Sequence, residues 1–175
     1  MGYTPHVDHR RSIRLPSWDY RENGAYFITI CAYERKCMFE GGRFTAPIGE
    51  IWRQIPAHFA GVEVDELVVM PNHVHGIILI ARPTVGAHHD APLRMSVPRR
   101  PILHRGSLGA VLLQFKSAAA KRINELRGTP GAPVWQRNYY ERVLRDDREL
   151  DRAREYILDN PRRWAEDKYN PLARP

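Results

Sequence analysis

The sequence has few cysteines and no long apolar run. Cys31 and Cys37 are the only thiols among 175 residues, and thiols in a reducing compartment are expected to stay unbridged. No apolar stretch approaches the roughly 20 residues that span a bilayer, and the polar N-terminus lacks a hydrophobic signal core. We therefore expect a cytoplasmic protein without disulfides, rather than a secreted or membrane-spanning one.

Acidic residues are too few to balance the basic ones in the second half of the chain. Residues 1–98 hold 10 basic and 10 acidic side chains, whereas residues 99–175 hold 17 and 10, which accounts for the whole net charge of +7. Arginine dominates the basic half, and its planar guanidinium suits bidentate contacts with phosphate. This uneven distribution of charge favours a polyanionic partner such as a nucleic acid. Solvated helix faces would give the same composition.

Hydrophobic periodicity predicts four strands and three helices. Strands are indicated by alternating or β-branched, aromatic-rich segments, and helices by apolar residues at helical spacing. The expected strands cover residues 25–33, 62–70, 73–81 and 133–145, and the expected helices cover residues 48–60, 106–126 and a segment after Asp146. Asp146, with Glu149 three residues later, has the pattern of a helix cap, and Pro161 should end this last helix near Asn160. Pro56 should kink or shorten the first helix. The Pro-Asn pair between the second and third strands predicts an antiparallel hairpin.

The order β-α-β-β-α-β-α predicts an α+β fold. Its first six elements follow the split βαβ, ferredoxin-like arrangement, a four-stranded antiparallel sheet with two helices on one face. We expect an N-terminal arm at residues 1–24, a single domain at 25–164 and a C-terminal tail at 165–175. Residues 82–105 carry several prolines without a steady period, which predicts a flexible loop inside that domain.

Two histidines stand at the start of the third predicted strand, in the segment MPNHVHGIILI. Strand alternation puts His73 and His75 on the same face with Cα atoms about 6.6 Å apart, so both imidazoles can reach one ion. Two histidines alone make a weak divalent site, because a stable one needs a third protein ligand. The simpler interpretation is a pair of half-exposed histidines.

Two polar residues on the last predicted helix can complete such a site. Tyr156 and Asn160 are four residues apart and share a helix face, at the edge of an apolar stripe where helix meets sheet. An amide oxygen there can be a hard ligand beside two imidazoles, and a phenol can act as a nucleophile. Ordinary packing residues at the end of an amphipathic helix would show the same pattern.

The histidines of PNHVHG, combined with Y-x-x-x-N-P on a C-terminal helix, resemble the motifs of single-tyrosine transposases, which belong to the H-hydrophobic-H class of single-strand DNA endonucleases. The sequence is most similar to the REP-associated tyrosine transposase branch, over about residues 25–164. The resemblance implies a ferredoxin-like (RRM-like) sheet with the tyrosine on an added C-terminal helix. It also implies that His73, His75 and Asn160 hold Mg²⁺ or Mn²⁺ and that Tyr156 is the nucleophile.

The resemblance further implies a substrate and a reaction. The partner would be single-stranded, hairpin or REP-like DNA, bound by a monomer or a homodimer. Attack of Tyr156 on a phosphodiester, with the metal as a Lewis acid, would give a 5′-phosphotyrosine intermediate and then strand transfer. Two alternatives stay open: a catalytically silent, RRM-like nucleic-acid-binding module, and a zinc-dependent hydrolase that uses the histidine pair.

Basic residues of the arm, the long helix and the fourth strand are candidates for contacts with the DNA backbone. They are Arg10, Arg11, Arg14, Lys116, Lys121, Arg122, Arg137, Arg142 and Arg145. For any one of them, a solvated charge is an equally good interpretation. Tyr139 and Tyr140 would face opposite sides of a strand, one in the core and the other able to stack on a base. Tyr156 is the preferred nucleophile because only it has a ligand-type residue four positions later.

Overall fold

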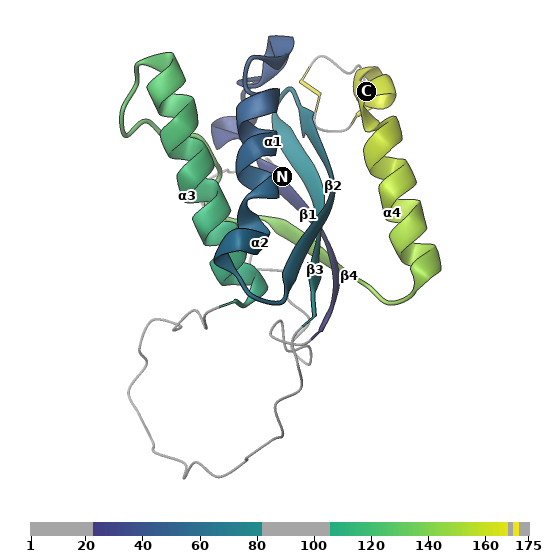
Figure 1. The fold of residues 1–175 in the computed structure, drawn as a ribbon. Coiled ribbons are helices and arrows are strands. Elements are labelled where there is room, and N and C mark those ends of the chain that lie inside the picture. Colours follow the sequence, from purple (N-terminus) through teal and green to yellow (C-terminus); the bar gives the residue numbers. More distant parts are fainter. Residues whose placement is uncertain (1–22, 82–105, 168–169, 172–175) are drawn as a thin grey trace, which may run out of the picture.

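The computed structural model describes residues 23–81, 106–167 and 170–171 (Figure 1). Almost all of the predicted arm, the predicted loop at 82–105 and much of the predicted tail lie outside these residues. Arg10, Arg11 and Arg14 lie outside them as well. The predictions made for these segments therefore stay predictions.

The described residues form a sheet of four strands with helices on both faces. The strands are β1 (Gly24–Cys31), β2 (Val62–Met70), β3 (His73–Ile80) and β4 (Tyr140–Leu144). The α-helices are α1 (Thr45–Arg53), α2 (Ile55–His58), α3 (Leu108–Arg127) and α4 (Asp147–Asp159). Short 3-10 turns are η1 (Tyr33–Arg35), η2 (Glu40–Gly42) and η3 (Asn160–Glu166).

The strand order is β2-β3-β1-β4, and every pair of neighbours is antiparallel. This is the order of a ferredoxin-like sheet, so the predicted α+β fold is confirmed. Figure 1 shows α1, α2 and α3 on one face of the sheet and α4 on the other. The added C-terminal helix therefore covers the face that a two-layer ferredoxin-like domain would leave open.

Side-chain alternation along the strands divides the core between the two faces. On β1, Tyr26, Ile28 and Ile30 are fully buried in the main cluster, together with residues of α1 and α3. The intervening Phe27 packs with a smaller cluster on the opposite face, in which Ile157 of α4 is buried. The same period-two alternation sends alternate residues of β3 toward α4.

The first predicted helix is interrupted, as Pro56 suggested. The structure replaces the helix expected at residues 48–60 with α1 and the single turn α2, in which the proline occupies an N-terminal position. A proline is tolerated there because the N–H groups of the first turn have no partner within the helix. The prediction of a proline-shortened helix is confirmed.

The fourth strand is shorter than predicted. Residues 133–145 were expected in the sheet, but β4 begins at Tyr140. The preceding segment meets the sheet at an isolated bridge between Ala32 and Trp135. The Gln136 N–H donates to the Cys31 carbonyl at 2.9 Å, and the indole N–H of Trp135 donates to the Lys116 carbonyl at 3.0 Å, so the segment contacts both the end of β1 and α3.

Two expectations from composition also have structural counterparts. Within the described residues, Cys31 and Cys37 are not joined in a disulfide. No helix in that part of the chain is both long and apolar enough to cross a membrane.

Gly76 follows His75 in β3 and lies against the buried indole of Trp52. A Cβ atom at position 76 would lie 2.7 Å and 2.8 Å from two ring carbons of Trp52, inside the normal separation of carbon atoms. We expect Gly76→Ala to lower the free energy of unfolding by about 1–3 kcal/mol, the usual cost of overpacking. Urea denaturation measures this change.

Gly49 in α1 provides the matched control for that substitution. A Cβ atom there would contact only the Arg53 guanidinium, at 3.5 Å. Gly49→Ala should raise the free energy of unfolding by about 0.5–1 kcal/mol, because alanine is the better helix former. If Gly76→Ala is as stable as the unaltered protein, the close packing of α1 on β3 is wrong.

Candidate active site

His73 and His75 project from β3 toward the face that α4 covers. Both are buried, with 0% and 2% of their surface exposed, so the interpretation as half-exposed histidines is wrong. Burial follows because β3 is an inner strand and α4 closes this face of the sheet. Their Nε2 atoms are 2.9 Å apart, within hydrogen-bonding distance of each other. Both imidazoles are therefore aimed at one point, as the strand alternation predicted.

The other nitrogen of each imidazole is held by a polar side chain. Nδ1 of His73 lies 2.8 Å from Oδ1 of Asn72, and Nδ1 of His75 lies 2.8 Å from the Thr29 hydroxyl. A carbonyl oxygen only accepts, so Nδ1 of His73 carries the proton and its Nε2 holds a lone pair. The hydroxyl can donate or accept, which lets His75 present either a proton or a lone pair at Nε2. Such partners typically orient histidines whose other nitrogen binds a metal.

Tyr156 reaches from α4 to the histidine pair. Its ring centroid lies 5.3 Å from that of His75 and 5.8 Å from that of Phe27, both edge-on. The residue is also 43% exposed. The phenol is thus held beside the histidines and stays accessible to a substrate from solvent, as a nucleophile must be.

Asn160 closes the last turn of α4, on the same helix face as Tyr156. It was expected at the edge of the apolar stripe, but it is only 3% exposed. The reason is η3, which returns the chain to the sheet and places the Trp164 ring 6.1 Å from that of His73. Oδ1 of Asn160 is buried and accepts no hydrogen bond from any residue in the described ranges. Such an oxygen is costly to bury unless a ligand satisfies it.

Asp167 is a site residue that the sequence interpretation missed. Its Oδ2 lies 3.9 Å from Nε2 of His73, and its side chain is 8% exposed. It follows η3, so the same turn that buries Asn160 returns this carboxylate to the histidine pair. The one sequence signal is an acidic pair, Glu166 and Asp167, shortly after the Y-x-x-x-N-P segment.

The polar atoms of this site are of the chemical types that bind a divalent cation. Across residues 23–81, 106–167 and 170–171, no group of three or more His, Cys, Asp or Glu side chains is arranged to hold a metal. A site here would therefore depend on the amide of Asn160 as its third ligand. Neighbouring ligands of octahedral Mg²⁺ lie about 3 Å apart, close to the 2.9 Å between the two Nε2 atoms. The amide oxygen supplies the hard donor that such ions prefer.

A side-chain cap fixes where α4 begins. Oδ1 of Asp146 accepts from the Glu149 N–H at 2.7 Å, which confirms the predicted cap. The Glu149 carboxylate accepts from the Arg145 N–H at 3.2 Å, one residue before the donor used in a reciprocal capping box. The start of the helix and its buried apolar stripe together set the rotation that aims the tyrosine at the histidines.

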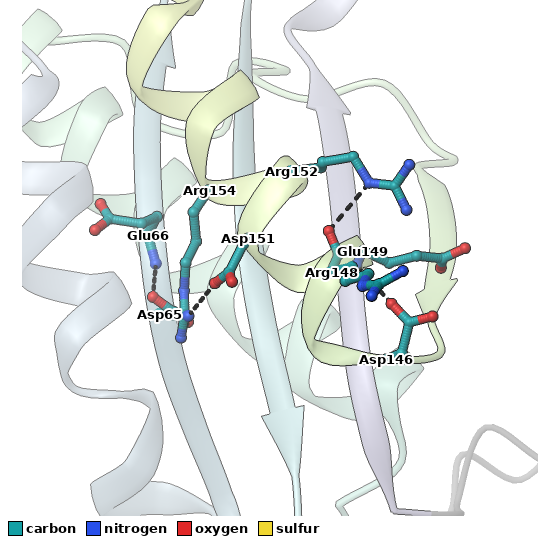
Figure 2. Close-up of polar contacts among 8 residues, drawn as sticks. All are labelled: Asp65, Glu66, Asp146, Arg148, Glu149, Asp151, Arg152 and Arg154. Atoms are coloured by element: carbon teal, nitrogen blue, oxygen red, sulfur yellow. Dashed lines mark hydrogen bonds and ion pairs between the residues drawn. The ribbon is translucent and has the colours of Figure 1, made fainter.

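An ion pair ties α4 to β2 (Figure 2). Arg154 donates to Oδ2 of Asp65 from Nε at 2.9 Å and from Nη2 at 2.6 Å, and its Nη1 reaches Asp151 at 3.1 Å. Asp65 lies where the register between β2 and β3 shifts. The hydrogen bonds to Asp65 raise the pKa of Arg154, so the guanidinium stays charged. The pair joins the helix two residues before Tyr156 to the edge of the sheet.

The predicted DNA-contacting residues within the described ranges are dispersed. Lys116, Lys121 and Arg122 belong to α3, Arg137 precedes β4, Arg142 lies in β4 and Arg145 follows it. Figure 1 places α3 on the face of the sheet away from α4. Burial lowers the pKa of Lys116 to about 8, and its ammonium donates to the carbonyls of Gln136 and Arg137 at 2.6 and 2.9 Å. Lys116 thus holds the segment before β4.

A pocket of about 450 Å³ lies between α4 and the strands β1, β3 and β4. Tyr156 and His75 line it, together with Tyr140 and Arg142 of β4 and Arg152 of α4. Tyr140 is 43% exposed, whereas Tyr139 packs against the main core. The prediction that these adjacent tyrosines face opposite sides is therefore confirmed. Arg152 was not predicted as a site residue.

Comparisons with known proteins bear on the motifs of this site. No family model matches the chain. A protein of unassigned function from Haemophilus influenzae is 35% identical over 183 residues, covering 95% of this chain and 96% of that protein. A second Haemophilus influenzae protein, provisionally named as a REP-associated tyrosine transposase, is 23% identical over 150 residues, covering 82% and 73% respectively. A solved REP-associated tyrosine transposase bound to a REP hairpin has a TM-score of 0.52 at 15% identity, covering 80% of this chain and 67% of that one.

The fold and the site together define a ferredoxin-like domain with a histidine pair on an inner strand and a tyrosine on an added helix. The chain belongs to the same family as the Haemophilus influenzae protein that is 35% identical to it. The resemblance to REP-associated tyrosine transposases, first indicated by two short motifs, is confirmed by a relative of that name and by the shared fold.

Proposed function

We propose that this protein is a transposase that cuts and rejoins single-stranded DNA beside a hairpin, with Tyr156 as its nucleophile. The observation that carries the proposal is the contact between Tyr156 and the buried histidine pair, with ring centroids 5.3 Å apart at His75. The accessible phenol and the paired imidazoles come from elements far apart in the sequence. Support also comes from the relative named as a REP-associated tyrosine transposase and from the fold shared with a hairpin-bound one.

In the proposed site, His73, His75 and Asn160 would hold Mg²⁺ or Mn²⁺. When bound, the ion supplies Lewis-acid stabilisation of the negative charge that develops on the scissile phosphate. The chain's own contribution is orientation. The hydrogen bonds at each Nδ1 fix the imidazole rings, and burial of the Asn160 side chain keeps water from its oxygen.

The proposed reaction is a transesterification at phosphorus. The oxygen of Tyr156 forms a bond to phosphorus while the bond from phosphorus to the 3′ oxygen of the preceding nucleotide breaks. The phenol loses its proton to water, and the departing 3′ oxygen takes one up. The DNA stays attached through a 5′-phosphotyrosine ester, so a 3′-hydroxyl of another strand can attack the same phosphorus and release the tyrosine. Strand transfer therefore needs no external energy source.

Basic residues beside the pocket are proposed to bind the DNA backbone. Arg142 lies in the pocket wall, and Arg137 and Arg145 flank the same strand. Binding through such contacts releases counterions from the DNA. The affinity therefore falls as the salt concentration rises.

The experiment that tests this function uses a DNA hairpin with single-stranded flanks, labelled at one end at a time and incubated with the protein and Mn²⁺. A 3′ label should move into a protein-sized band on a denaturing gel, because the tyrosine retains the 5′ phosphate of the downstream fragment. A 5′ label should appear in a shorter, protein-free fragment whose 3′-hydroxyl a polymerase can extend. Addition of EDTA should abolish both products.

The same gel separates the two alternatives. The zinc-dependent hydrolase, to which Asp167 would lend a carboxylate, predicts zinc-dependent cleavage without a protein-linked fragment. The silent binding module predicts a shift on a native gel and intact DNA on the denaturing one. Either pattern, with every hairpin tried, would overturn the proposed tyrosine chemistry.

The ion pair between α4 and β2 should position the nucleophile. We expect Arg154→Gln to slow formation of the covalent adduct by up to about 100-fold, the cost of a misplacement of about 1 Å at a reacting group. Mn²⁺ affinity should stay unchanged, because Arg154 contacts neither histidine and its partner Asp65 lies on β2, whereas both histidines lie on β3. Single-turnover kinetics and Mn²⁺ titration measure the two effects separately.

Arg148 gives the control for that variant. It is exposed on the same helix, and its side chain forms no ion pair within the described part of the chain. Arg148→Gln should leave the adduct rate within about twofold, as expected for an exposed side chain without a partner. Equal slowing in both variants would show that helix charge, rather than the bond to Asp65, governs the rate.

A further inference from the structure

The pocket beside Tyr156 is larger than the attack of a phenol on phosphorus requires. Its volume of about 450 Å³ lies in the range of sites for single small ligands, about 300–1,000 Å³. It extends under α4 from His75 on β3 across β1 to Tyr140 on β4. Whatever occupies it is therefore in direct reach of the proposed nucleophile.

One aromatic ring in this pocket is available for stacking. Phe27 already stacks on His75, with ring centroids 5.2 Å apart, and meets Tyr156 edge-on. Tyr140 also lines the pocket and is 43% exposed, and it has no ring contact with another described residue. An exposed aromatic face of this kind holds an unpaired base by about 1–3 kcal/mol.

The charged groups of the pocket are an exposed ion pair and an arginine without a carboxylate partner in the described part of the chain. Nη2 of Arg142 lies 3.2 Å from Oε1 of Glu149. Arg152 donates from Nε to the Arg148 carbonyl at 3.1 Å (Figure 2) and has no carboxylate partner in the described part of the chain. Its remaining N–H groups suit a phosphate oxygen.

Arg152 and Tyr156 are four residues apart on α4, so they stand on the same helix face about 6 Å from each other along the helix axis. A phosphate bound by Arg152 would thus neighbour the phosphate that Tyr156 attacks. Tyr140 projects into the same pocket from the strand opposite. A single nucleotide carries both a base and a phosphate, so one nucleotide can contact Tyr140 and Arg152 together.

We propose that this pocket seats one unpaired nucleotide next to the scissile phosphate, with its base stacked on Tyr140 and its phosphate bound by Arg152. The proposal rests on the proposed function, since it names the part of the DNA that this site selects. It predicts that cleavage requires a single-stranded nucleotide at one fixed position, because a base in a duplex is stacked on its neighbours and cannot enter.

The test measures binding in Tyr156→Phe, which cannot cleave and so keeps the substrate intact. Hairpins carry 2-aminopurine at one flank position at a time. Fluorescence should change strongly at one position next to the cleavage site mapped with the unaltered protein. Adding Tyr140→Leu should remove that change and weaken binding about 5- to 150-fold, the equivalent of 1–3 kcal/mol. Adding Tyr140→Phe, which keeps the aromatic face, should preserve the fluorescence change.

Two further measurements separate stacking from charge. An abasic site at the same position should weaken binding as much as Tyr140→Leu does, and the two changes together should cost no more than either one. Arg152→Gln should weaken binding of all sequences alike and reduce the slope of log affinity against log salt by about one.

The outcomes show separately whether the nucleotide pocket or the tyrosine mechanism is wrong. If the unaltered protein forms the covalent adduct but no flank position responds, or Tyr140→Leu leaves the response intact, the nucleotide pocket is wrong and the tyrosine mechanism stands. If the unaltered protein binds hairpins without forming an adduct, the proposed function fails. A fluorescence change that Tyr140→Leu abolishes would then still establish the pocket.

Discussion

Tyr156→Phe is expected to abolish the covalent protein–DNA adduct while hairpin affinity stays within about twofold. Phenylalanine retains the ring that packs edge-on against His75 and Phe27 and removes only the attacking oxygen. Loss of a nucleophile typically costs on the order of 10⁴-fold or more in rate, so no adduct should be visible on a denaturing gel. The affinity for the hairpin should persist, because the proposed contacts with the DNA backbone do not involve the phenol oxygen.

Tyr33 provides the matched control for Tyr156→Phe. It is a similarly exposed tyrosine that does not line the pocket. Tyr33→Phe should form the adduct at the rate of the unaltered protein. Persistence of the adduct in Tyr156→Phe would mean that another group attacks the phosphate, and the proposed mechanism would be wrong.

His73→Ala and His75→Ala are each expected to weaken Mn²⁺ binding by more than about 100-fold, beyond the 10- to 100-fold that loss of an outer hydrogen-bond partner costs. The reason is geometric, since the two Nε2 atoms are aimed at one point from 2.9 Å apart. Removing either one leaves a single imidazole, which is a poor site for a hard divalent ion. Titration of Mn²⁺ followed by electron paramagnetic resonance measures the affinity without reference to catalysis.

Two further substitutions, one remote from the histidine pair and one beside it, serve as controls for the histidine variants. His58 is exposed on α2, so His58→Ala should leave Mn²⁺ affinity unchanged. Asn72→Ala removes the acceptor for Nδ1 of His73 and should have an intermediate effect, about 10- to 100-fold. Unchanged Mn²⁺ affinity in both histidine variants would show that the imidazoles have only a packing role.

The elements that carry the site were predictable because their signals are local. Strand alternation in HVHGIILI put both histidines on one face, and the paired Nε2 atoms follow from it. The Asp146 cap and the apolar stripe predicted where α4 begins and which side it buries. The proline after Asn160 marked where the helix ends, which confirms the predicted boundary.

The parts that were missed depend on contacts between distant segments. Arg154 and Asp65 are separated by 89 residues in the sequence, and no local pattern pairs them. The burial of Asn160 and the approach of Asp167 both require η3 to return toward β3, which the prediction of a tail after residue 164 did not include.

The fourth strand was overextended for a similar reason. Residues 133–139 contain aromatic and β-branched side chains with the pattern of a strand, so their local preference was read correctly as extended. Their backbone pairs only briefly with the end of β1, where the Gln136 N–H donates to the Cys31 carbonyl, and Trp135 and Lys116 then tie the segment to α3. Which partner an extended segment takes is decided by tertiary packing rather than by propensity.

The most direct test is to identify the amino acid that carries the DNA. The adduct formed with Mn²⁺ is digested with nuclease and trypsin, and the peptide that retains a nucleotide is sequenced by mass spectrometry. Trypsin separates Tyr156, in residues 155–162, from Tyr139 and Tyr140, in residues 138–142. The nucleotide should be found on Tyr156 through its 5′ phosphate. A nucleotide on the 138–142 peptide, or DNA cleaved with no modified peptide, would contradict Tyr156 as the nucleophile.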